Sequence, residues 1–244
     1  MLPRVLYSDL FNEDNTLDKK QLHYLKNVLR LTQGDEFMLF DGKGCEARAK
    51  IIFNSNGETK FEIDNWKSFD RENAIDIVVA QSICLSNKMD LVVQKSTELG
   101  ANLILPIITK RTVSKLTLRK QKEKVERWGK IAVSASAQCG RNNVPNILAP
   151  MKLSDFFDFV NLKYSGATKW ILDPFCNNSI STAKLKENSN LILTIGPEAG
   201  FTDCEELLAH QNGFQRIRCG RRILRTETVC IVALSVIISR LNQM

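Results

Sequence analysis

The chain has 244 residues, of which 43% are hydrophobic and 25% are charged, as in globular proteins of one or two domains. It contains no run of 18 apolar residues and its N-terminus lacks the apolar segment of a signal peptide, so we predict a cytoplasmic protein without a membrane span. Seven scattered cysteines form no C-x-x-C pair and there are only two histidines. These counts argue against a metal site and against histidine-based nucleophilic catalysis.

The net charge of +7 is distributed unevenly along the chain. Residues 1–70 hold 10 basic and 12 acidic side chains, whereas the remainder holds 24 basic and 15 acidic. A positive excess in one part of a chain indicates a polyanionic partner. A solvated basic face is the alternative that charge alone leaves open.

The first elements in chain order are predominantly strands. Apolar spacing at Leu22, Leu25, Val28 and Leu29 predicts a helix within 19–31. Strand-like segments follow at 36–42, 45–52 and 59–69, with a turn at Asp41-Gly42. This pattern is typical of a small barrel that carries one helix, and the polar segment "DRENA" (70–74) is the predicted domain boundary.

From residue 75 onward, strands and helices alternate. We predict strands at 75–83, 102–109, 169–174, 190–196 and 214–219, and helices at 88–100 and 118–140 that end on glycine. Alternating strands and helices predict a mainly parallel sheet covered by helices.

The segment "LILTIGPEAGFTDCEE" (191–206) places an acid at a strand-to-helix junction. Pro197 ends the predicted strand, and Thr202 with Glu205 fits a capping box at the start of a helix. Ligands bind open α/β sheets at the carboxyl ends of strands, so Glu198 is expected to face a binding crevice. The plainer interpretation is a tight turn with an exposed acid.

The segment "CGRRILRTETV" (219–229) follows another predicted strand. Together with the end of that strand it places five arginines within ten residues, and arginine forks suit phosphates and base edges. Thr226 is the predicted N-cap of the next helix, with Glu227 in its first turn. A solvated loop is the alternative, although the apolar pair Ile223-Leu224 is unusual for one.

Residues 110–127 hold eight basic and two acidic side chains, mostly on the predicted helix 118–140. The turn "QCGRNNVP" (138–145) follows that helix and contains Arg141. A positive helix face suits phosphate contact, but a solvated face is the more common reason for such a run. No phosphate-binding G-x-x-x-x-G-K-[ST] loop and no G-x-G-x-x-G after a strand occurs in the sequence.

Four segments in this order, "QKSTELGANLILPI", "SASAQCGRNNVP", "LTIGPEAGFTDCE" and "GRRILRTET", resemble the RsmE family. These are uridine N3-methyltransferases of small-subunit (16S) ribosomal RNA within the SPOUT superfamily. The resemblance covers nearly the whole chain and includes "HYLKNVLR" and "LFDGKG" in the first part.

The resemblance implies a PUA-like β-barrel that binds RNA over residues 1–70 and a SPOUT α/β methyltransferase domain over 74–244. It further implies a parallel sheet with a deep C-terminal trefoil knot, S-adenosylmethionine as the methyl donor, and a homodimer. The implied partner is 16S rRNA or the small ribosomal subunit, with no metal and no membrane.

The resemblance also implies residue roles. Arg225 is expected to stabilise a uracil anion, and Glu198 and Glu227 are candidate bases that the sequence does not rank. The residues expected to hold the donor are Leu172, Asp173, Pro174, Gly196, Pro197, Glu198, Gly200, Ile217, Cys219, Gly220, Ile223, Leu224 and Thr226. The residues expected to contact RNA are Arg30, Lys88, Lys95, Arg111, Lys115, Arg119, Arg141, Asn142, Arg221 and Arg222.

Two positions depart from the family pattern. Ala199 stands where a glycine is usual, which narrows the expected pocket and excludes some backbone conformations with positive φ. Arg221 replaces a proline, which removes rigidity and adds charge. The sequence leaves open three other functions: methylation of a ribose 2′-hydroxyl or another base position, a non-enzymatic ribosome-assembly factor, and a phosphate-binding protein.

Overall fold

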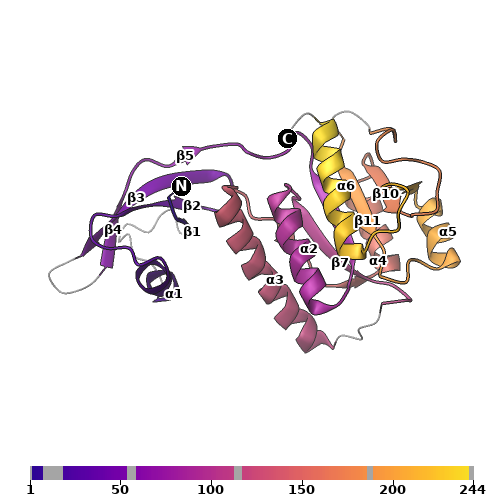
Figure 1. The fold of residues 1–244 in the computed structure, drawn as a ribbon. Coiled ribbons are helices and arrows are strands. Elements are labelled where there is room, and N and C mark those ends of the chain that lie inside the picture. Colours follow the sequence, from indigo (N-terminus) through magenta and orange to yellow (C-terminus); the bar gives the residue numbers. More distant parts are fainter. Residues whose placement is uncertain (1, 8–18, 54–58, 113–116, 186–188, 242–244) are drawn as a thin grey trace. The chain divides into compact units, whose positions relative to one another are not determined.

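A computed structural model describes residues 2–7, 19–53, 59–112, 117–185 and 189–241 (Figure 1). The chain divides into two compact units: unit 1 is Met1–Glu72 with Val133–Val144, and unit 2 is Asn73–Ala132 with Pro145–Met244. Helix α3 (Leu118–Cys139) therefore contributes residues to both units. The domain boundary at 70–74 remains a prediction. The compact units change from one to the other near this boundary, but residues 133–144 belong to unit 1 and not to the second predicted domain.

Unit 1 is built on a five-stranded sheet of order β1-β2-β3-β4, in which β5 also pairs with β3. The first two strands run parallel and the other pairings are antiparallel. The buried side chains of this unit include Leu25, Phe37, Leu39, Ile51 and Phe61. The strands are β1 (Arg4–Leu6), β2 (Glu36–Phe40), β3 (Cys45–Phe53), β4 (Thr59–Ile63) and β5 (Lys67–Ser68).

The helix predicted within 19–31 differs in type from the expectation. Helix α1 (Lys19–His23) continues as the π-helix η1 (Tyr24–Val28), in which the N–H of Leu29 donates to the carbonyl of Tyr24 at 2.9 Å. The wider turn is followed by Arg30, whose φ of 55° lies in the left-handed region. Apolar spacing alone does not distinguish these two helix types.

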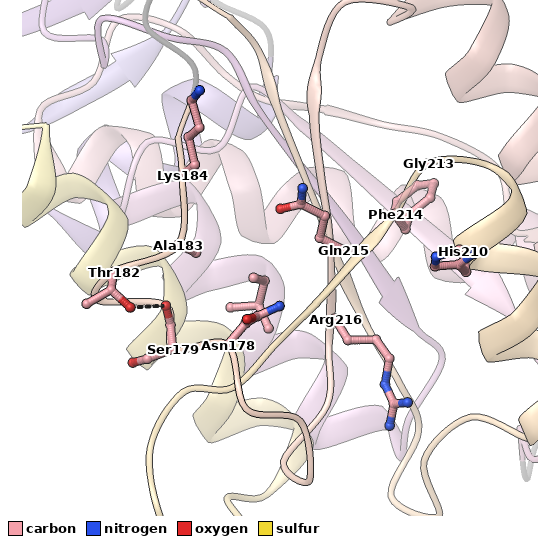
Figure 2. A pocket seen from close by; sticks show the side chains of 11 residues that line it. Asn178, Ser179, Thr182, Ala183, Lys184, His210, Gly213, Phe214, Gln215 and Arg216 are labelled. Carbon is pink, nitrogen blue, oxygen red and sulfur yellow. Dashed lines mark hydrogen bonds between the residues drawn. The ribbon is translucent and has the colours of Figure 1, made fainter.

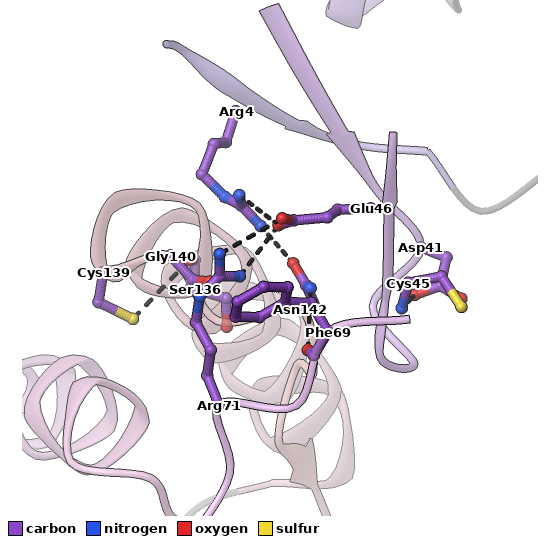
Figure 3. A network of polar contacts seen from close by, with 10 residues as sticks. All are labelled: Arg4, Asp41, Cys45, Glu46, Phe69, Arg71, Ser136, Cys139, Gly140 and Asn142. Atoms are coloured by element: carbon purple, nitrogen blue, oxygen red, sulfur yellow. Dashed lines mark hydrogen bonds and ion pairs between the residues drawn. The ribbon is translucent and has the colours of Figure 1, made fainter. Parts of the chain in front are cut away.

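A polar network joins distant segments of unit 1 (Figure 3). Arg4 donates to Glu46 at 2.8 Å and also to the side-chain oxygen of Asn142. Arg71 donates to Glu46 at 3.0 Å and to the carbonyl of Gly140 at 2.9 Å. The hydrogen bond from Arg71 is the largest influence that lowers the pKa of Glu46, to about 2. The network therefore joins residues 138 positions apart around one ionised carboxylate.

Unit 2 contains a seven-stranded sheet of order β12-β10-β11-β6-β7-β8, with β9 also paired to β7. The strand pairings of this sheet among the described residues are parallel, which confirms the predicted parallel sheet. Its strands are β6 (Ile77–Ser82), β7 (Leu103–Ile108), β8 (Asn146–Ile147), β9 (Met151–Lys152), β10 (Thr168–Leu172), β11 (Leu191–Ile195) and β12 (Gln215–Ile217). The short strands β8 and β9 were not predicted, because two residues show no periodicity.

Helices cover both faces of this sheet, as expected for parallel strands. Helix α4 (Leu153–Lys163), which was not predicted, packs Phe156, Phe157 and Val160 against Val78 of β6 together with the end of α5 (Asp203–Gln211). Successive strand side chains point to opposite faces. Gln81, three residues after Val78, accordingly contacts α6 (Thr226–Arg240) on the other face, where α6 also packs on α2 (Ser86–Glu98).

The strand order places a switch point between β11 and β6. The chain proceeds from β6 to β7 and β8 on one side, and β10 and β12 lie on the other. Ligand sites of open parallel sheets lie outside the carboxyl ends of the strands at such a point. In the described part of the chain, no helix combines the length and apolarity needed to cross a membrane.

Candidate functional site

A cavity of about 580 Å³ lies at the carboxyl ends of β10, β11 and β12 and at the start of α6. Its volume is within the usual range of small-molecule sites. Thirteen of its lining residues are those that the sequence assigned to the methyl donor: Leu172, Asp173, Pro174, Gly196, Pro197, Glu198, Gly200, Ile217, Cys219, Gly220, Ile223, Leu224 and Thr226. The structure therefore brings all of the predicted donor residues to one place.

The loop after β11 forms one wall of the cavity. Pro197 ends the strand, and the N–H of Gly200 donates to the carbonyl of Pro197 at 2.9 Å. Gly200 has a φ of 70°, which a residue with a side chain rarely adopts. Ala199 is not in the left-handed region, so the methyl group at this position causes no backbone strain. The predicted capping box of Thr202 and Glu205 is confirmed and starts α5.

The start of α6 is hydrogen-bonded to this loop through one buried hydroxyl. Thr226 Oγ1 donates to the carbonyl of Gly196 at 2.8 Å and accepts from Gln81 Nε2 at 2.9 Å. The prediction that Thr226 is the N-cap is wrong, because Arg225 is the N-cap and Thr226 is the first helical residue. Its hydroxyl bonds another segment instead of its own helix.

Arg111 holds the same loop from the side of β7. Its guanidinium donates to the carbonyls of Ala199 at 2.8 Å and Phe201 at 2.9 Å. Arg111 also lines the cavity. Sequence reasoning assigned this residue to RNA contact, but in this structure it fixes the backbone of the cavity wall.

The end of β10 is fixed by an ion pair with β12. Asp173 is buried and accepts from Arg216 Nε at 2.7 Å and from the N–H of Phe175 at 2.9 Å. Arg216 also lies 3.3 Å from Glu206 of α5. Burial is the largest influence that raises the pKa of Glu206. This pairing neutralises one of the five arginines that the sequence placed near the site.

Charged side chains gather at one end of the cavity, and we call Lys88, Glu198 and Glu227 the Lys88 cluster. Lys88 Nζ lies 3.0 Å from Glu198 Oε1 and 3.6 Å from Glu227 Oε2. The hydrogen bond with Glu198 raises the pKa of Lys88. Partial burial is the largest single influence on the pKa of Glu198 and raises it, but the hydrogen bond from Lys88, a backbone hydrogen bond and the charge of Lys88 together lower the pKa. Arg225 lines the same cavity, and within the described residues no ion pair engages it.

Several residues predicted to contact RNA are exposed. Arg119 pairs only with Glu123 along its own helix, and Lys95 pairs with Glu98. The exposed residues of this set are Arg30, Arg111, Arg119, Arg221 and Arg222, of which Arg111 and Arg222 also line the cavity. Lys115 lies outside the described residues.

Two others of this set are buried. Arg141 is 4% exposed and forms an ion pair with Glu72, and Asn142 is 1% exposed and donates to the carbonyl of Phe69 at 3.2 Å. Neither side chain is accessible to a phosphate in this conformation. We therefore leave both out of the proposed RNA-contacting set.

Sequence reasoning missed some of the residues that line the cavity. Phe175 is 78% exposed and follows the end of β10, so the rule that ligands lie at strand ends would have found it. Glu206 had no such signal, because its approach depends on the packing of α5. The lining residues that were not predicted are Phe175, Ile195, Ala199, Phe201, Glu206 and Val229.

A second cavity of about 580 Å³ lies beside β12 (Figure 2). It is bordered by residues 178–184, the end of α5 and Gln215–Ile217, and most of these side chains are exposed. Ile217 is the only predicted site residue on its border, so we do not assign the predicted chemistry to it.

No group of three or more potential metal ligands occurs among the described residues. A family model described as an RNA methyltransferase domain matches residues 71–238, and one described as an RNA methyltransferase PUA domain matches residues 17–60.

Individual proteins give the same result. Ribosomal RNA small subunit methyltransferase E of Bacillus subtilis is 32% identical over 228 residues, which are 89% of this chain and 87% of that protein. A methyltransferase structure from Legionella pneumophila with bound SAM is 32% identical with a TM-score of 0.89, and covers 98% of both chains. The SAM-bound small subunit methyltransferase E of Neisseria gonorrhoeae is 29% identical with a TM-score of 0.87 and the same coverage. The chain therefore belongs to the RsmE family of ribosomal RNA small subunit methyltransferases, as its sequence motifs indicated.

Proposed function

We propose that this protein transfers a methyl group from S-adenosylmethionine to N3 of a uridine in small-subunit ribosomal RNA. The observation that carries the proposal is that all thirteen predicted donor residues line one cavity at the carboxyl ends of β10, β11 and β12 of the parallel sheet. Membership of the RsmE family supports the same reaction.

The residues of the cavity fit S-adenosylmethionine. Leu172, Ile217 and Leu224 supply an apolar surface for an adenine ring. Gly220 has a φ of 141° and no atom within 4 Å of the position of a Cβ, so the ligand can approach its backbone. When bound, the donor supplies an electrophilic methyl group on a sulfonium. The chain supplies the cavity that orients it, and such positioning contributes up to roughly 7–11 kcal/mol in favourable cases.

Arg225 is the proposed electrostatic catalyst. Arg225 is at the start of α6 beside the Lys88 cluster, and the positive charge of Arg225 acts to lower the pKa of Lys88. The N–H groups of the Arg225 guanidinium suit one carbonyl oxygen beside N3 of uracil, O2 or O4, which leaves N3 open to the methyl carbon. Negative charge develops on these oxygens as N3 loses its proton, so Arg225 stabilises the transition state more than the ground state.

The target uridine must be unpaired, because N3 is hidden in a base pair. We propose that Arg119, Arg221 and Arg222 contact phosphates, and that Arg30 does so from a PUA-like barrel in residues 1–70. We also propose a homodimer, a cytoplasmic location and a C-terminal trefoil knot that includes α6. The proposed knot follows the family resemblance, and Arg240 holds α6 against the segment before β11 by donating to the carbonyls of Ile180 and Ala183.

The proposal is tested by incubating the purified protein with labelled S-adenosylmethionine and small ribosomal subunits that lack the modification. Mass spectrometry of the digested RNA is expected to detect one 3-methyluridine per subunit. A methyl group on a ribose or on another base position would replace the proposed reaction with a related one. Donor binding without any transfer to RNA or subunits would favour a non-enzymatic assembly factor.

Replacing Arg111 with alanine is expected to weaken the binding of S-adenosylmethionine about tenfold or more. The reason is that two backbone carbonyls of the cavity wall lose the charged guanidinium that donates hydrogen bonds to both. Hydrogen bonds to charged groups contribute roughly 1.5–3 kcal/mol each. Calorimetry with S-adenosylmethionine alone measures the effect. Arg119→Ala, which removes an exposed charge away from the cavity, is the matched control. Equal donor affinity in the two variants would show that Arg111 does not order the loop.

A further inference from the structure

The two carboxylates of the Lys88 cluster have unequal environments. Glu198 accepts a hydrogen bond from Lys88 at 3.0 Å, and its side chain is 34% exposed. The side chain of Glu227 is 12% exposed, and its Oε2 is 3.6 Å from Lys88, beyond hydrogen-bonding distance. Among the described residues this buried oxygen accepts no hydrogen bond.

A buried carboxylate oxygen without a donor is costly, and such atoms are rare in folded proteins. Glu227 directly follows two residues that line the proposed donor cavity, Arg225 and Thr226, and its Oε2 lies 3.6 Å from Nζ of a third, Lys88. An N–H of a substrate is the kind of group that would satisfy it. Glu198 differs because its proton-accepting oxygen is already bonded to a cation, which makes it a weaker base.

We propose that Glu227 removes the N3 proton of the target uridine and that Lys88 is a positioning residue that keeps Glu198 out of this role. This inference rests on the proposed function. The N3–H bond breaks, its proton goes to Glu227 Oε2 and its electron pair stays on the nitrogen, which bonds the methyl carbon. The carbon–sulfur bond breaks and its electron pair stays on sulfur, leaving a neutral thioether.

The charged and titratable groups around Glu227 come from several elements. Lys88 extends from α2, Glu198 from the loop after β11, and Arg225 from the turn before α6. Cys84 follows β6, and burial, reinforced by Glu198 and Glu227, raises the pKa of its thiol to about 12. The thiol is therefore neutral and is not an alternative base.

The first test is the pH dependence of single-turnover methyl transfer by Glu227→Gln. With a carboxylate base the rate is expected to be flat across the neutral range, whereas without it the rate depends on ionisation of uridine in solution. The variant is therefore expected to be at least 100-fold slower at neutral pH and to gain about tenfold per pH unit. Glu198→Gln is the matched comparison, and its rate is expected to keep the flat profile of the parent whatever its magnitude.

The second test concerns Lys88. Lys88→Met removes the cation that lies 3.0 Å from Glu198 and 3.6 Å from Glu227 and leaves the two carboxylates without it. Two carboxylates without a shared cation hold a proton more readily, and the base works only when ionised, so loss of activity on acidification is expected to begin at a higher pH. Lys88→Arg keeps the charge and is expected to restore the parental profile.

Two controls apply to Glu227→Gln. Its affinity for S-adenosylmethionine, measured by calorimetry without RNA, is expected to stay within about threefold of the parent. Its melting temperature is expected to stay within a few degrees of the parent. A flat profile in Glu227→Gln, or a pH-dependent one in Glu198→Gln instead, would overturn the inference. If Lys88→Met loses activity on acidification at the same pH as the parent, Lys88 has no part in the inferred mechanism. An inactive parent enzyme would refute the proposed function itself, so the two failures are distinguishable.

Discussion

Replacing Arg225 with alanine is expected to slow methyl transfer by about 100- to 1,000-fold while leaving donor affinity nearly unchanged. Removal of one preorganised donor to a developing oxyanion has effects of this size in other enzymes. Arg225 is suited to this role because it lines the cavity and forms no ion pair within the described part of the chain. Arg216, by contrast, is neutralised by Asp173 and Glu206.

The measurement is single-turnover transfer to small subunits, with calorimetry of S-adenosylmethionine in parallel. Arg221→Ala is the control, since that arginine belongs to the same loop but does not line the cavity. Arg225→Lys keeps the charge without the planar fork and is expected to recover part of the rate. If donor affinity and rate fall by the same factor in Arg225→Ala, the residue binds the donor and has no separate role in stabilising the uracil anion.

Replacing Gly196 with valine is expected to abolish measurable donor binding. A Cβ at this position would lie 3.0 Å and 3.2 Å from two carbons of the Phe201 ring and 3.5 Å from Gly200 Cα. The extra methyl groups of valine must displace Phe201 or the loop that carries Glu198. Overpacking of this kind costs about 1–3 kcal/mol of stability, and the displaced loop is one wall of the cavity.

Calorimetry with S-adenosylmethionine and the melting temperature of the free protein measure the two effects. Gly166→Ala is the control, because a Cβ there meets nothing within 4 Å and its φ is not positive. Adding Phe201→Ala to Gly196→Val makes room for the valine and is expected to recover part of the stability. Full donor affinity in Gly196→Val would mean that the donor binds elsewhere.

Features that depend on neighbours in sequence could be predicted. Pro197 ending β11 and the capping box at Thr202 are local, and they placed the loop at a strand end before helix α5. The parallel sheet followed from the alternation of strands and helices. All thirteen predicted donor residues then line one cavity, because carboxyl ends of adjacent parallel strands lie at the same edge.

Features that depend on partners far along the chain could not be predicted. Arg111 bonds carbonyls 88 and 90 residues away, and Lys88 pairs with Glu198 across 110 residues. Arg141 was predicted to contact RNA because of its charge, but it forms a buried ion pair with Glu72. The sequence shows which anionic groups a basic side chain can bind. Only the fold shows whether an acidic residue of the same chain already pairs with it.

The hydroxyl of Thr226 has a consequence for the order in which the protein matures. It joins the end of β6, the carbonyl of Gly196 and the first turn of α6, three segments that span 145 residues. Until the final helix has been synthesised and docked, the wall that contains Gly196 lacks this anchor. A partly synthesised chain that ends before residue 226 is therefore expected to be unable to retain the donor, so the enzyme acquires activity in a single late step.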